Sequence, residues 1–335
     1  MHRFLSPFVR TRTRLACTAG VLVAALIAGL LPMGLLRDDP APATPVTAGP
    51  RTEADARAQA AATGEEVLVD TATNAHEQTW ARPDGQLRTE IHPVPQRAKN
   101  AAGQWAPIDT TLIRDDATGT LRPANPVAPV RFFAGDVAAA TGGGTGGGTG
   151  VTSVLAEADF EGHTISYTWP GPLPTPVVDG NRALYPEALP GVDLLMVAQA
   201  EGGFGQMLIV KTPEAATQDR VRHPDFGLHS ETLTFHRQEE TGGAVARDET
   251  GAEISSIPTP YAWDSSGTNT LEPGQPLRTS TATTADVLNL SGRGYIEPSA
   301  RQAIMPLRLD GDGTGTARLH LDADATGLLT GDATY

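Results

Sequence analysis

From Glu65 onward, turn-forming residues divide the sequence into short runs. Pro, Gly, Asn and Asp recur at intervals of roughly 8 to 12 residues, and the runs between them alternate apolar and polar side chains. Pro83-Asp84-Gly85 is an example, because proline fixes one backbone dihedral angle and glycine readily adopts a positive φ. This punctuation leaves little room for long helices. It predicts a mainly β fold of antiparallel, sandwich-like lobes.

The same signals predict further hairpins with turns at 100–103, 116–119 and 201–205. One short Ala-rich helix is predicted at 52–64. Thr52 is its expected N-cap, Asp55 occupies the capping-box position and Gly64 stops the helix.

Aromatic residues make up 5% of the chain and prolines number 27, so any one sheet buries little apolar surface. We therefore expect two modest lobes. The first is a β-rich domain over 65–250, and the second is a β-rich segment over 251–335 that is incomplete at its C-terminus. A polar stretch at 265–294, rich in Gly and Pro, is expected to be a loop within the second lobe.

The first 36 residues predict export. Four arginines precede an uncharged apolar run from Leu15 to Leu36, which is long for a signal peptide and long enough to span a bilayer. A cleaved signal peptide and a retained transmembrane anchor both fit this run, and in either case the N-terminal segment contacts the membrane. The positive-inside rule places the rest of the chain outside the cytoplasm. We expect the general secretory route, an extracellular or cell-surface location, and a spacer with the short helix over 37–64.

The charge of the exported part argues against nucleic acid as a partner. The whole chain carries a formal net charge of −14. Removal of residues 1–43 takes away five of 25 basic side chains and two of 39 acidic ones, which leaves a net charge near −17. Such a surface repels phosphate backbones. Cys17 is the single cysteine and lies in the apolar run, so no disulfide stabilises the exported part.

The decapeptide TGGGTGGGTG at 141–150 contains the spacing of a dinucleotide-binding fingerprint, at Gly142, Gly144 and Gly147. That motif needs a preceding strand and a following helix, whose N-terminus holds the pyrophosphate. The next dozen residues are rich in β-branched side chains and do not favour a helix. The repeat of Thr and Gly explains the spacing by itself. We predict a slack Gly-rich loop and no cofactor.

The sequence DGDGTGTARLHLD places Asp310, Asp312 and Thr314 at alternate positions, like the start of an EF-hand calcium loop. The twelfth position is Leu321, where an EF-hand has a bidentate glutamate. A turn between two strands explains the sequence equally well. These three residues are weak candidates for a metal site.

A second metal hypothesis concerns the segment RHPDFGLHSETLTFH, which holds His223, Asp225, His229, Glu231 and His236. Zinc sites in helices place two histidines four residues apart, whereas the spacings here are six and seven. His229 and His236 are expected to point to opposite faces of one strand. We interpret these histidines as solvated.

No sequence motif nominates a catalytic residue. The chain contains no G-x-S-x-G, and carboxylates of a glycosidase would meet only in the folded structure. Trp80, Trp105, Trp169 and Trp263 are interpreted as core residues, with sugar-stacking platforms as the alternative.

Four segments in a fixed order resemble the N-terminal region of large secreted actinobacterial proteins. The strongest is ALYPEALPGVDLLMVAQAEGGFGQMLIVKTPEAA at 183–216, and the others lie at 103–112, 165–183 and 257–267. In such proteins this region precedes laminin-G-like jelly-roll domains, DNRLRE-type modules or Rhs/YD-repeat arrays. The resemblance implies a surface or secreted scaffold and no catalytic residues, with any chemistry located downstream of Tyr335.

We therefore expect a non-enzymatic extracellular structural or interaction module, the N-terminal part of a larger secreted or cell-surface protein. Its expected partners are cell-wall polysaccharide or another surface protein. Two alternatives are a carbohydrate-binding module and a hydrolase whose carboxylates converge only in the fold.

Overall fold

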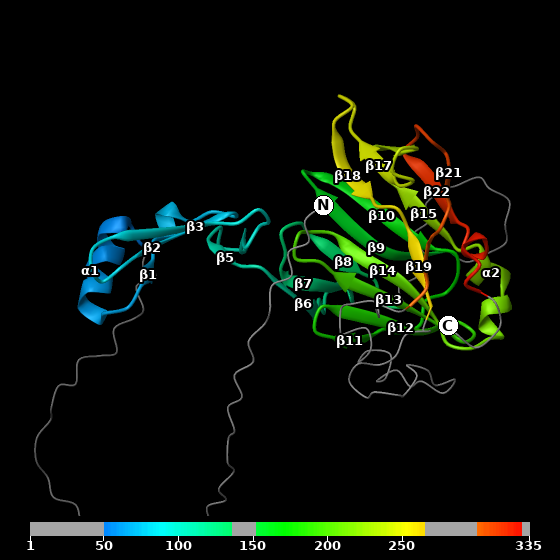
Figure 1. Ribbon diagram of the computed structural model, residues 1–335, viewed down its shortest axis with the longest axis horizontal. Helices are drawn as coiled ribbons and strands as arrows, with labels where there is room; N and C mark the ends of the chain where they lie inside the picture. The colour runs from blue at the N-terminus through cyan, green and yellow to red at the C-terminus, as the bar shows by residue number, and fades with distance from the viewer. Residues whose placement is uncertain (1–49, 136–151, 265–299, 330–335) are drawn as a thin grey trace, which may run out of the picture. The chain divides into compact units, whose positions relative to one another are not determined.

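The computed structural model describes residues 50–135, 152–264 and 300–329 (Figure 1). It is mainly β, with 47% strand and 10% helix, and the paired strands are antiparallel. The predicted mainly β, antiparallel fold is confirmed. The apolar run at 15–36, the Gly-rich loop at 141–150 and the polar stretch at 265–294 lie outside the described residues. Among the helices that the structure describes, none has the length and apolar character needed to cross a bilayer.

The predicted Ala-rich helix is present as α1 (Glu53–Thr63). The Thr52 hydroxyl accepts a hydrogen bond from the Asp55 backbone N–H, and the Asp55 carboxylate accepts one from the Thr52 N–H, each at 3.3 Å. This reciprocal pair is a capping box, which satisfies two backbone donors at the start of the helix. Gly64 adopts φ 74°, the left-handed conformation that commonly ends helices.

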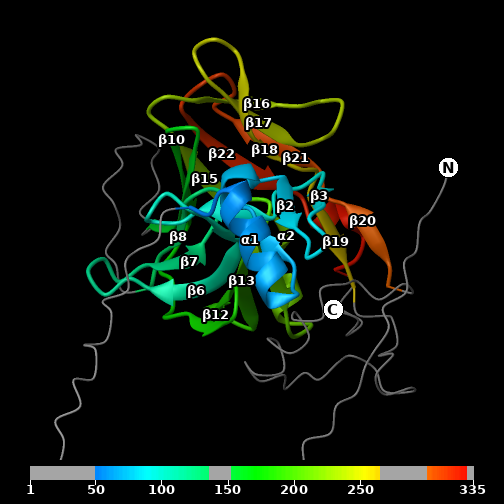
Figure 2. The ribbon, with the colours of Figure 1, turned by 90° about the vertical axis from the view of Figure 1, so that its left-hand side faces the viewer.

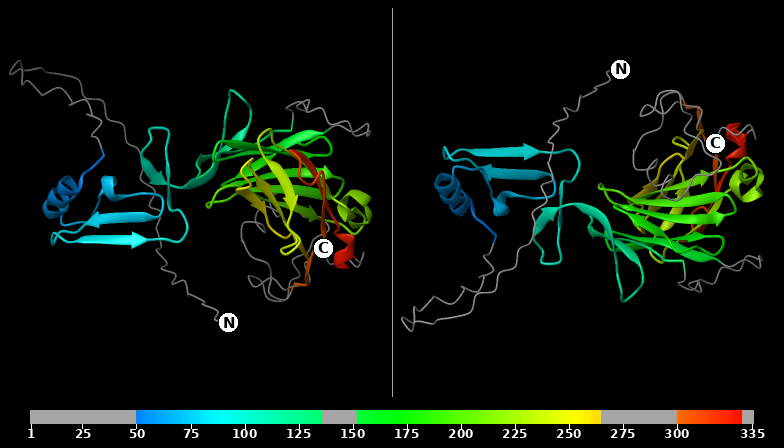
Figure 3. Two further views of the ribbon diagram at one scale, coloured as in Figure 1. Left: turned by 90° about the horizontal axis from the view of Figure 1, so that it is seen from above. Right: turned by 90° about the horizontal axis from the view of Figure 1, so that it is seen from below.

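A small three-stranded sheet packs against α1. Its order is β1 (Val67–Leu68), β2 (Glu77–Ala81) and β3 (Leu87–Ile91), so β3 is an outer strand (Figure 3). The β2–β3 hairpin turns at the predicted position, with Gly85 at φ 80°. One small core joins helix and sheet, and its members are Ala56, Ala60, Val67, Val69 and Ala81. A separate hairpin of β4 (Arg97–Lys99) and β5 (Trp105–Pro107) turns at 100–103, also as predicted.

The largest sheet has eight strands in the order β21-β22-β15-β10-β9-β8-β7-β6. Their bounds are β6 (Asp109–Arg114), β7 (Leu121–Asn125), β8 (Val130–Phe132), β9 (Ser153–Phe160), β10 (His163–Trp169), β15 (Asp225–His229), β21 (Leu307–Asp310) and β22 (Thr316–Leu321). The β6–β7 hairpin spans the turn predicted at 116–119. The segment that follows the Gly-rich loop is strand β9, antiparallel to β8.

A second sheet of four strands completes a sandwich. Its order is β11 (Val177–Asp179), β12 (Arg182–Leu189), β13 (Val192–Ala198) and β14 (Phe204–Val210). Strand β13 alternates between two apolar environments. Val192, Leu194 and Met196 join the main core shared with the eight-stranded sheet, whereas Leu195 belongs to a smaller cluster with Leu184. The β13–β14 hairpin is present, but its turn lies at 199–203, two residues before the predicted 201–205, and Gly205 is part of β14.

The remaining elements are short. One sheet contains β16 (Thr234–Arg237), β17 (Ala244–Arg247) and β18 (Glu253–Ile257), seen near the top of Figure 2. A two-stranded pair contains β19 (Tyr261–Trp263) and β20 (Gln302–Ile304). Helical turns are η1 (Asp70–Ala72), η2 (Ala215–Thr217), α2 (Asp219–Arg222) and η3 (Asp324–Thr326).

The boundary predicted at 250/251 does not separate two sheets. Strand β15 from the first predicted lobe pairs with β22 from the second, with Phe226 opposite Leu319. Both side chains are buried in the main core, together with Leu307 and Leu309 of β21. The physical reason is burial, because β21 and β22 cover apolar surface of the sandwich that β15 alone leaves open.

Candidate functional site

The first candidate group, the His320 cluster, consists of Asp225, Arg308, Asp310 and His320. Asp225 on β15 lies opposite His320 on β22, and its Oδ1 is 2.5 Å from His320 Nδ1. The other ring nitrogen, Nε2, is 2.9 Å from Asp310 Oδ2. Arg308 Nη1 donates to Asp310 Oδ1 at 2.6 Å. The imidazole thus bridges two carboxylates and donates to both when it is protonated.

The three weak candidates for a metal site, Asp310, Asp312 and Thr314, have separate partners. Asp310 belongs to the His320 cluster, at the end of β21. Asp312 Oδ1 accepts a hydrogen bond from the Arg237 backbone N–H at 2.9 Å. The Thr314 hydroxyl lies 2.7 Å from the carbonyl oxygens of Gly311 and Thr316. The loop joins two antiparallel strands, so the structure uses it as a β-turn connection.

No group of three or more His, Cys, Asp or Glu side chains within residues 50–135, 152–264 and 300–329 is placed to hold a metal ion. Calcium binding by the loop at 310–316 stays a prediction. The second metal hypothesis needs a correction in its geometry. His229 ends β15 and His236 lies in β16, so the two belong to different sheets and not to opposite faces of one strand. Each contacts a threonine hydroxyl, His229 that of Thr316 and His236 that of Thr234.

A cavity of about 220 Å³ adjoins the His320 cluster through Asp225. Its other lining residues are Trp169, Pro170, Arg220 and His223. Trp169 is 1% exposed, and its indole Nε1 has no hydrogen-bond partner. The Arg220 guanidinium lies 5.3 Å from the indole ring centroid and donates to the Pro170 carbonyl. The volume is below the roughly 300 to 1,000 Å³ of typical small-molecule sites, so the cavity suits only a small group.

A partly buried charge group, the Lys211 cluster, consists of Glu187, Asp193 and Lys211, of which Glu187 is exposed. The Asp193 side chain is 1% exposed and that of Lys211 is 14% exposed. Asp193 Oδ1 accepts hydrogen bonds from Lys211 Nζ at 2.7 Å and from the Glu187 backbone N–H at 2.8 Å. Glu187 has φ 53°, and its carboxylate accepts hydrogen bonds from Lys211 Nζ and from the Gly191 N–H. These residues lie in the 183–216 segment that carries the resemblance.

The charges of the Lys211 cluster shift one another's pKa values. The hydrogen bond from Lys211, with that from the Gly191 N–H, lowers the pKa of Glu187 below its ordinary value of 4.5. Burial acts to lower the pKa of Lys211, but its hydrogen bonds to Asp193 and Glu187 outweigh burial and raise it above 10.5. The charged forms of Glu187 and Lys211 are therefore favoured over their neutral forms. The ion pairs connect Glu187 on β12 and Asp193 on β13 to Lys211, which directly follows β14.

Burial also affects the pKa values of two tyrosines in the sandwich, Tyr185, which is fully buried, and Tyr167, which is partly buried. Desolvation raises the pKa of Tyr167 to about 12. It raises the pKa of Tyr185 as well, and the Tyr185 hydroxyl donates to the Phe133 carbonyl at 2.6 Å. Both phenols therefore remain neutral in solution near neutral pH, as structural groups of the core.

The four tryptophans have different environments, so the interpretation as core residues holds for Trp169 and needs correction for the others. Trp80, Trp105 and Trp263 are partly exposed. The Arg88 guanidinium lies 4.4 Å from the Trp80 ring, and Lys99 Nζ lies 5.4 Å from the Trp105 ring. These are sheet-surface positions, where a cation covers the ring.

Trp263 forms an aromatic pair with Tyr261 on β19. Their ring centroids are 5.4 Å apart and their planes are inclined by 35°. Residues two apart share one face of a strand, and Tyr261 is 50% exposed. Ile304 on β20 lies opposite Tyr261 and is 68% exposed. This face is an exposed apolar and aromatic patch.

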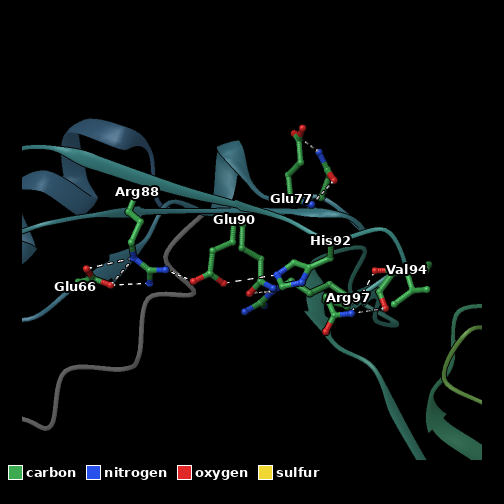
Figure 4. Close-up of polar contacts among 11 residues, drawn as sticks. Glu66, Glu77, Arg88, Glu90, His92, Val94 and Arg97 are labelled. Atoms are coloured by element: carbon green, nitrogen blue, oxygen red, sulfur yellow. Dashed lines mark hydrogen bonds and ion pairs between the residues drawn. The ribbon is translucent and has the colours of Figure 1, made fainter. Parts of the chain in front are cut away.

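A chain of charged side chains follows the small N-terminal sheet (Figure 4). Arg88 lies between two carboxylates, with Nη2 at 2.7 Å from Glu66 Oε2 and Nη1 in contact with Glu90. Glu90 Oε2 is 3.6 Å from His92 Nε2. The hydrogen bond from Arg88 lowers the pKa of Glu66. The chain joins Glu66, which precedes β1, to two residues of β3 and to His92, which follows β3.

Several of these groups escaped prediction because their members are distant in sequence. Asp225 and His320 are 95 residues apart, and the sequence shows no spacing that links them. Asp193 and Lys211 are 18 apart on neighbouring strands. The Tyr261–Trp263 pair did have a local signal, since two aromatic residues at i and i+2 in a strand must share a face.

Comparison of the chain with models of protein families, with curated proteins and with solved structures finds no match.

Proposed function

We propose that the chain is a non-enzymatic extracellular interaction module, the N-terminal part of a larger secreted or cell-surface protein. One observation supports this above others: the tightly held carboxylates Asp193, Asp225 and Asp310 are each paired with a cationic or imidazole group of a neighbouring strand. These pairs fix strand positions within the sandwich. The acidic exported part and the apolar run at 15–36 support a location outside the cytoplasm.

The hydrolase alternative makes an opposite prediction for the His320 cluster. If Asp225 and Asp310 serve only to hold strands together, Asp225→Asn lowers the free energy of unfolding. The variant then leaves the rate at which cell-wall polysaccharides are hydrolysed unchanged. The assay measures release of reducing sugar by the wild-type chain and by the variant. Cleavage by the wild type that the variant loses, with the fold retained by circular dichroism, contradicts the non-enzymatic proposal.

The Tyr261–Trp263 pair favours carbohydrate binding as a second candidate function. The Tyr261 and Trp263 rings have centroids 5.4 Å apart on the same face of β19. Their ring faces offer an apolar surface on which the C–H faces of consecutive sugars can pack. Polar groups flank them, because Gln302 lies opposite Trp263 and the Arg301 Nε donates to Asp264 at 2.6 Å. Cell-wall polysaccharide is the partner that this patch fits best.

The test is retention of the chain on insoluble cell-wall polysaccharide. Trp263→Ala is expected to weaken retention roughly fivefold, since one aromatic contact contributes on the order of 1 kcal/mol. Trp80→Ala is the matched control, because Trp80 is also partly exposed but lies on another sheet under Arg88. Equal loss in both variants, or no retention of the wild type, rejects the carbohydrate proposal.

A further inference from the structure

Within residues 50–135, 152–264 and 300–329, no strand pairs with the outer backbone edge of β3. Thr79 on β2 accepts a hydrogen bond from the Val69 N–H, so its backbone faces β1. Adjacent residues of a strand direct their backbone groups to opposite sides, so Gln78 and Trp80 face β3. Their register partners Glu90 and Arg88 face β2 in return. The backbone groups of Leu87, Thr89 and Ile91 therefore point away from the sheet.

The same edge exposes large apolar side chains. Leu87 is 38% exposed, Ile91 is 73% exposed and Val94, just beyond the strand, is 43% exposed. The small core beneath α1 contains three alanines and two valines, so it leaves these side chains without cover. A long apolar edge of this kind favours pairing with another strand.

The sequence of β3, LRTEI, is complementary to itself in the antiparallel direction. A two-fold axis through Thr89 places Arg88 opposite Glu90 of a second copy, and Glu90 opposite its Arg88. The same axis places Leu87 opposite Ile91 of the second copy. Arg88 and Glu90 fall at non-hydrogen-bonded positions, where side chains approach most closely, and the outward backbone groups of Leu87, Thr89 and Ile91 form the hydrogen bonds.

From this complementarity we propose that two copies of the chain associate through β3, forming one continuous six-stranded sheet from two three-stranded sheets. The interface is isologous, so each attractive pair occurs twice. The occupant of the β3 edge is thus a second copy of this chain.

Other registers are less favourable. In an antiparallel pair the two-fold axis can pass through any residue of the strand. An axis through Arg88 places the two Arg88 side chains opposite one another, and an axis through Glu90 does the same for the two Glu90 carboxylates, so both bring like charges together. An axis through Ile91 places Pro93 opposite Thr89, and proline lacks the N–H that the ladder requires. An axis through Leu87 places Gly85, in the β2–β3 turn at φ 80°, opposite Thr89, and leaves Ile91 without an apolar partner.

The first experiment compares Thr89→Pro with Thr89→Val in the full chain, by sedimentation over a range of concentrations. Proline removes an N–H that faces outward, so the β2–β3 ladder keeps its hydrogen bonds. Valine keeps the N–H and removes the same hydroxyl, which contacts Thr79 Oγ1. We expect a concentration-dependent dimer for the wild type and Thr89→Val, and a monomer for Thr89→Pro. A wild type that stays monomeric, or a Thr89→Pro dimer of wild-type affinity, overturns the proposal.

The second experiment does not depend on the proline variant folding. In a Cys17→Ser background, Thr89→Cys gives the chain one cysteine at the two-fold axis. Paired Cα atoms about 5.5 Å apart lie within the roughly 4.4 to 6.8 Å that a disulfide spans. We expect rapid disulfide-linked dimer under mild oxidation, and little from the control Thr250→Cys, in an exposed turn. Equal rates at both positions contradict pairing at β3.

The third experiment exchanges the charges. Arg88→Glu and Glu90→Arg each place like charges opposite one another twice, which weakens the dimer roughly tenfold or more. The double exchange restores opposite charges and is expected to recover most of the affinity. Failure of the double variant to exceed both single variants contradicts the Thr89-centred register.

Discussion

At the scale of single residues, Asp193 shows how one buried carboxylate organises its surroundings. It holds Lys211 and the Glu187 backbone N–H with the same oxygen, and its Oδ2 has no hydrogen-bond partner. The interactions keep Glu187 at φ 53°, a conformation that non-glycine residues seldom adopt. The irregularity between Tyr185 and Leu189 in the β12–β13 register lies at this place. A side-chain charge thus fixes a backbone shape that hydrophobic alternation alone does not specify.

We expect Asp193→Ala to lower the free energy of unfolding by about 3 kcal/mol or more, because Lys211 loses its buried anion and keeps only the more exposed Glu187 of the cluster as a partner. Lys211→Met keeps most of the length and removes the charge. The double variant is expected to lose less than the sum of the two single losses, since neither Asp193 nor Lys211 is left as a buried charge without the other. Urea denaturation of the four proteins measures the coupling. Strict additivity indicates that the pair does not act as a unit.

The pKa shifts of the same cluster give a pH dependence with a definite sign. The folded pKa of Glu187 is lowered, so its stabilising contribution is present above the ordinary value of 4.5 and is lost as the pH falls below it. The folded pKa of Lys211 is raised, so its contribution is present below 10.5 and is lost as the pH rises through the folded value. Glu187→Gln is expected to flatten the acid side of the stability profile measured by urea denaturation. An unchanged slope below pH 4.5 contradicts this assignment.

At the scale of elements, local signals predicted more than long-range ones did. The helix at 52–64 was predictable because its cap, stop and alanine content all lie within one segment. Turns at Pro83–Gly85 and 100–103 were predictable for the same reason, since proline, glycine and asparagine act on their own backbone. The pairing partners of the strands in the eight-stranded sheet were not predictable from the sequence. Strand pairing there depends on a core whose residues are distant in the chain.

The capping box of α1 carries its own prediction. Thr52→Ala removes the acceptor for the Asp55 N–H and is expected to destabilise the helix by about 1 kcal/mol. Thr52→Ser keeps the hydroxyl and serves as the control. Hydrogen exchange of the α1 amides reports the effect locally, even if the sandwich is unaffected. Equal exchange rates in the two variants show that the cap contributes nothing.

At the scale of the whole molecule, the sandwich is assembled from strands that are far apart in the chain. Strand β22 pairs with β15 across a separation of 87 residues at His229 and Thr316. The sequence analysis placed the two segments in different lobes, 65–250 and 251–335, because low aromatic content argued for small cores. The structure reaches one large core by using many Leu, Val and Ala side chains from both sheets.

If residues 307–321 unfold in the same cooperative unit as β9 and β10, a substitution that destabilises β21 or β22 must also destabilise β9 and β10. Leu319 is 3% exposed, and Leu319→Ala is expected to cost about 2 to 5 kcal/mol. Amides of β9 and β10 are expected to lose protection from hydrogen exchange to the same extent. Arg318→Ala, at the neighbouring exposed position, is expected to change stability by less than about 0.5 kcal/mol. Loss of protection confined to β21 and β22 contradicts a single unit.

The late position of β22 affects how the chain is made. A ribosome adds roughly 5 to 20 residues per second, so the edge of β15 waits for several seconds before β22 is synthesised. During that interval Phe226 and Leu228 have no covering strand from the C-terminal side. The nascent polypeptide is therefore open to chaperones, and to premature pairing with other molecules, for most of the time that residues 230–315 are being translated. A codon change that slows translation after β15 lengthens this window without altering a single amino acid.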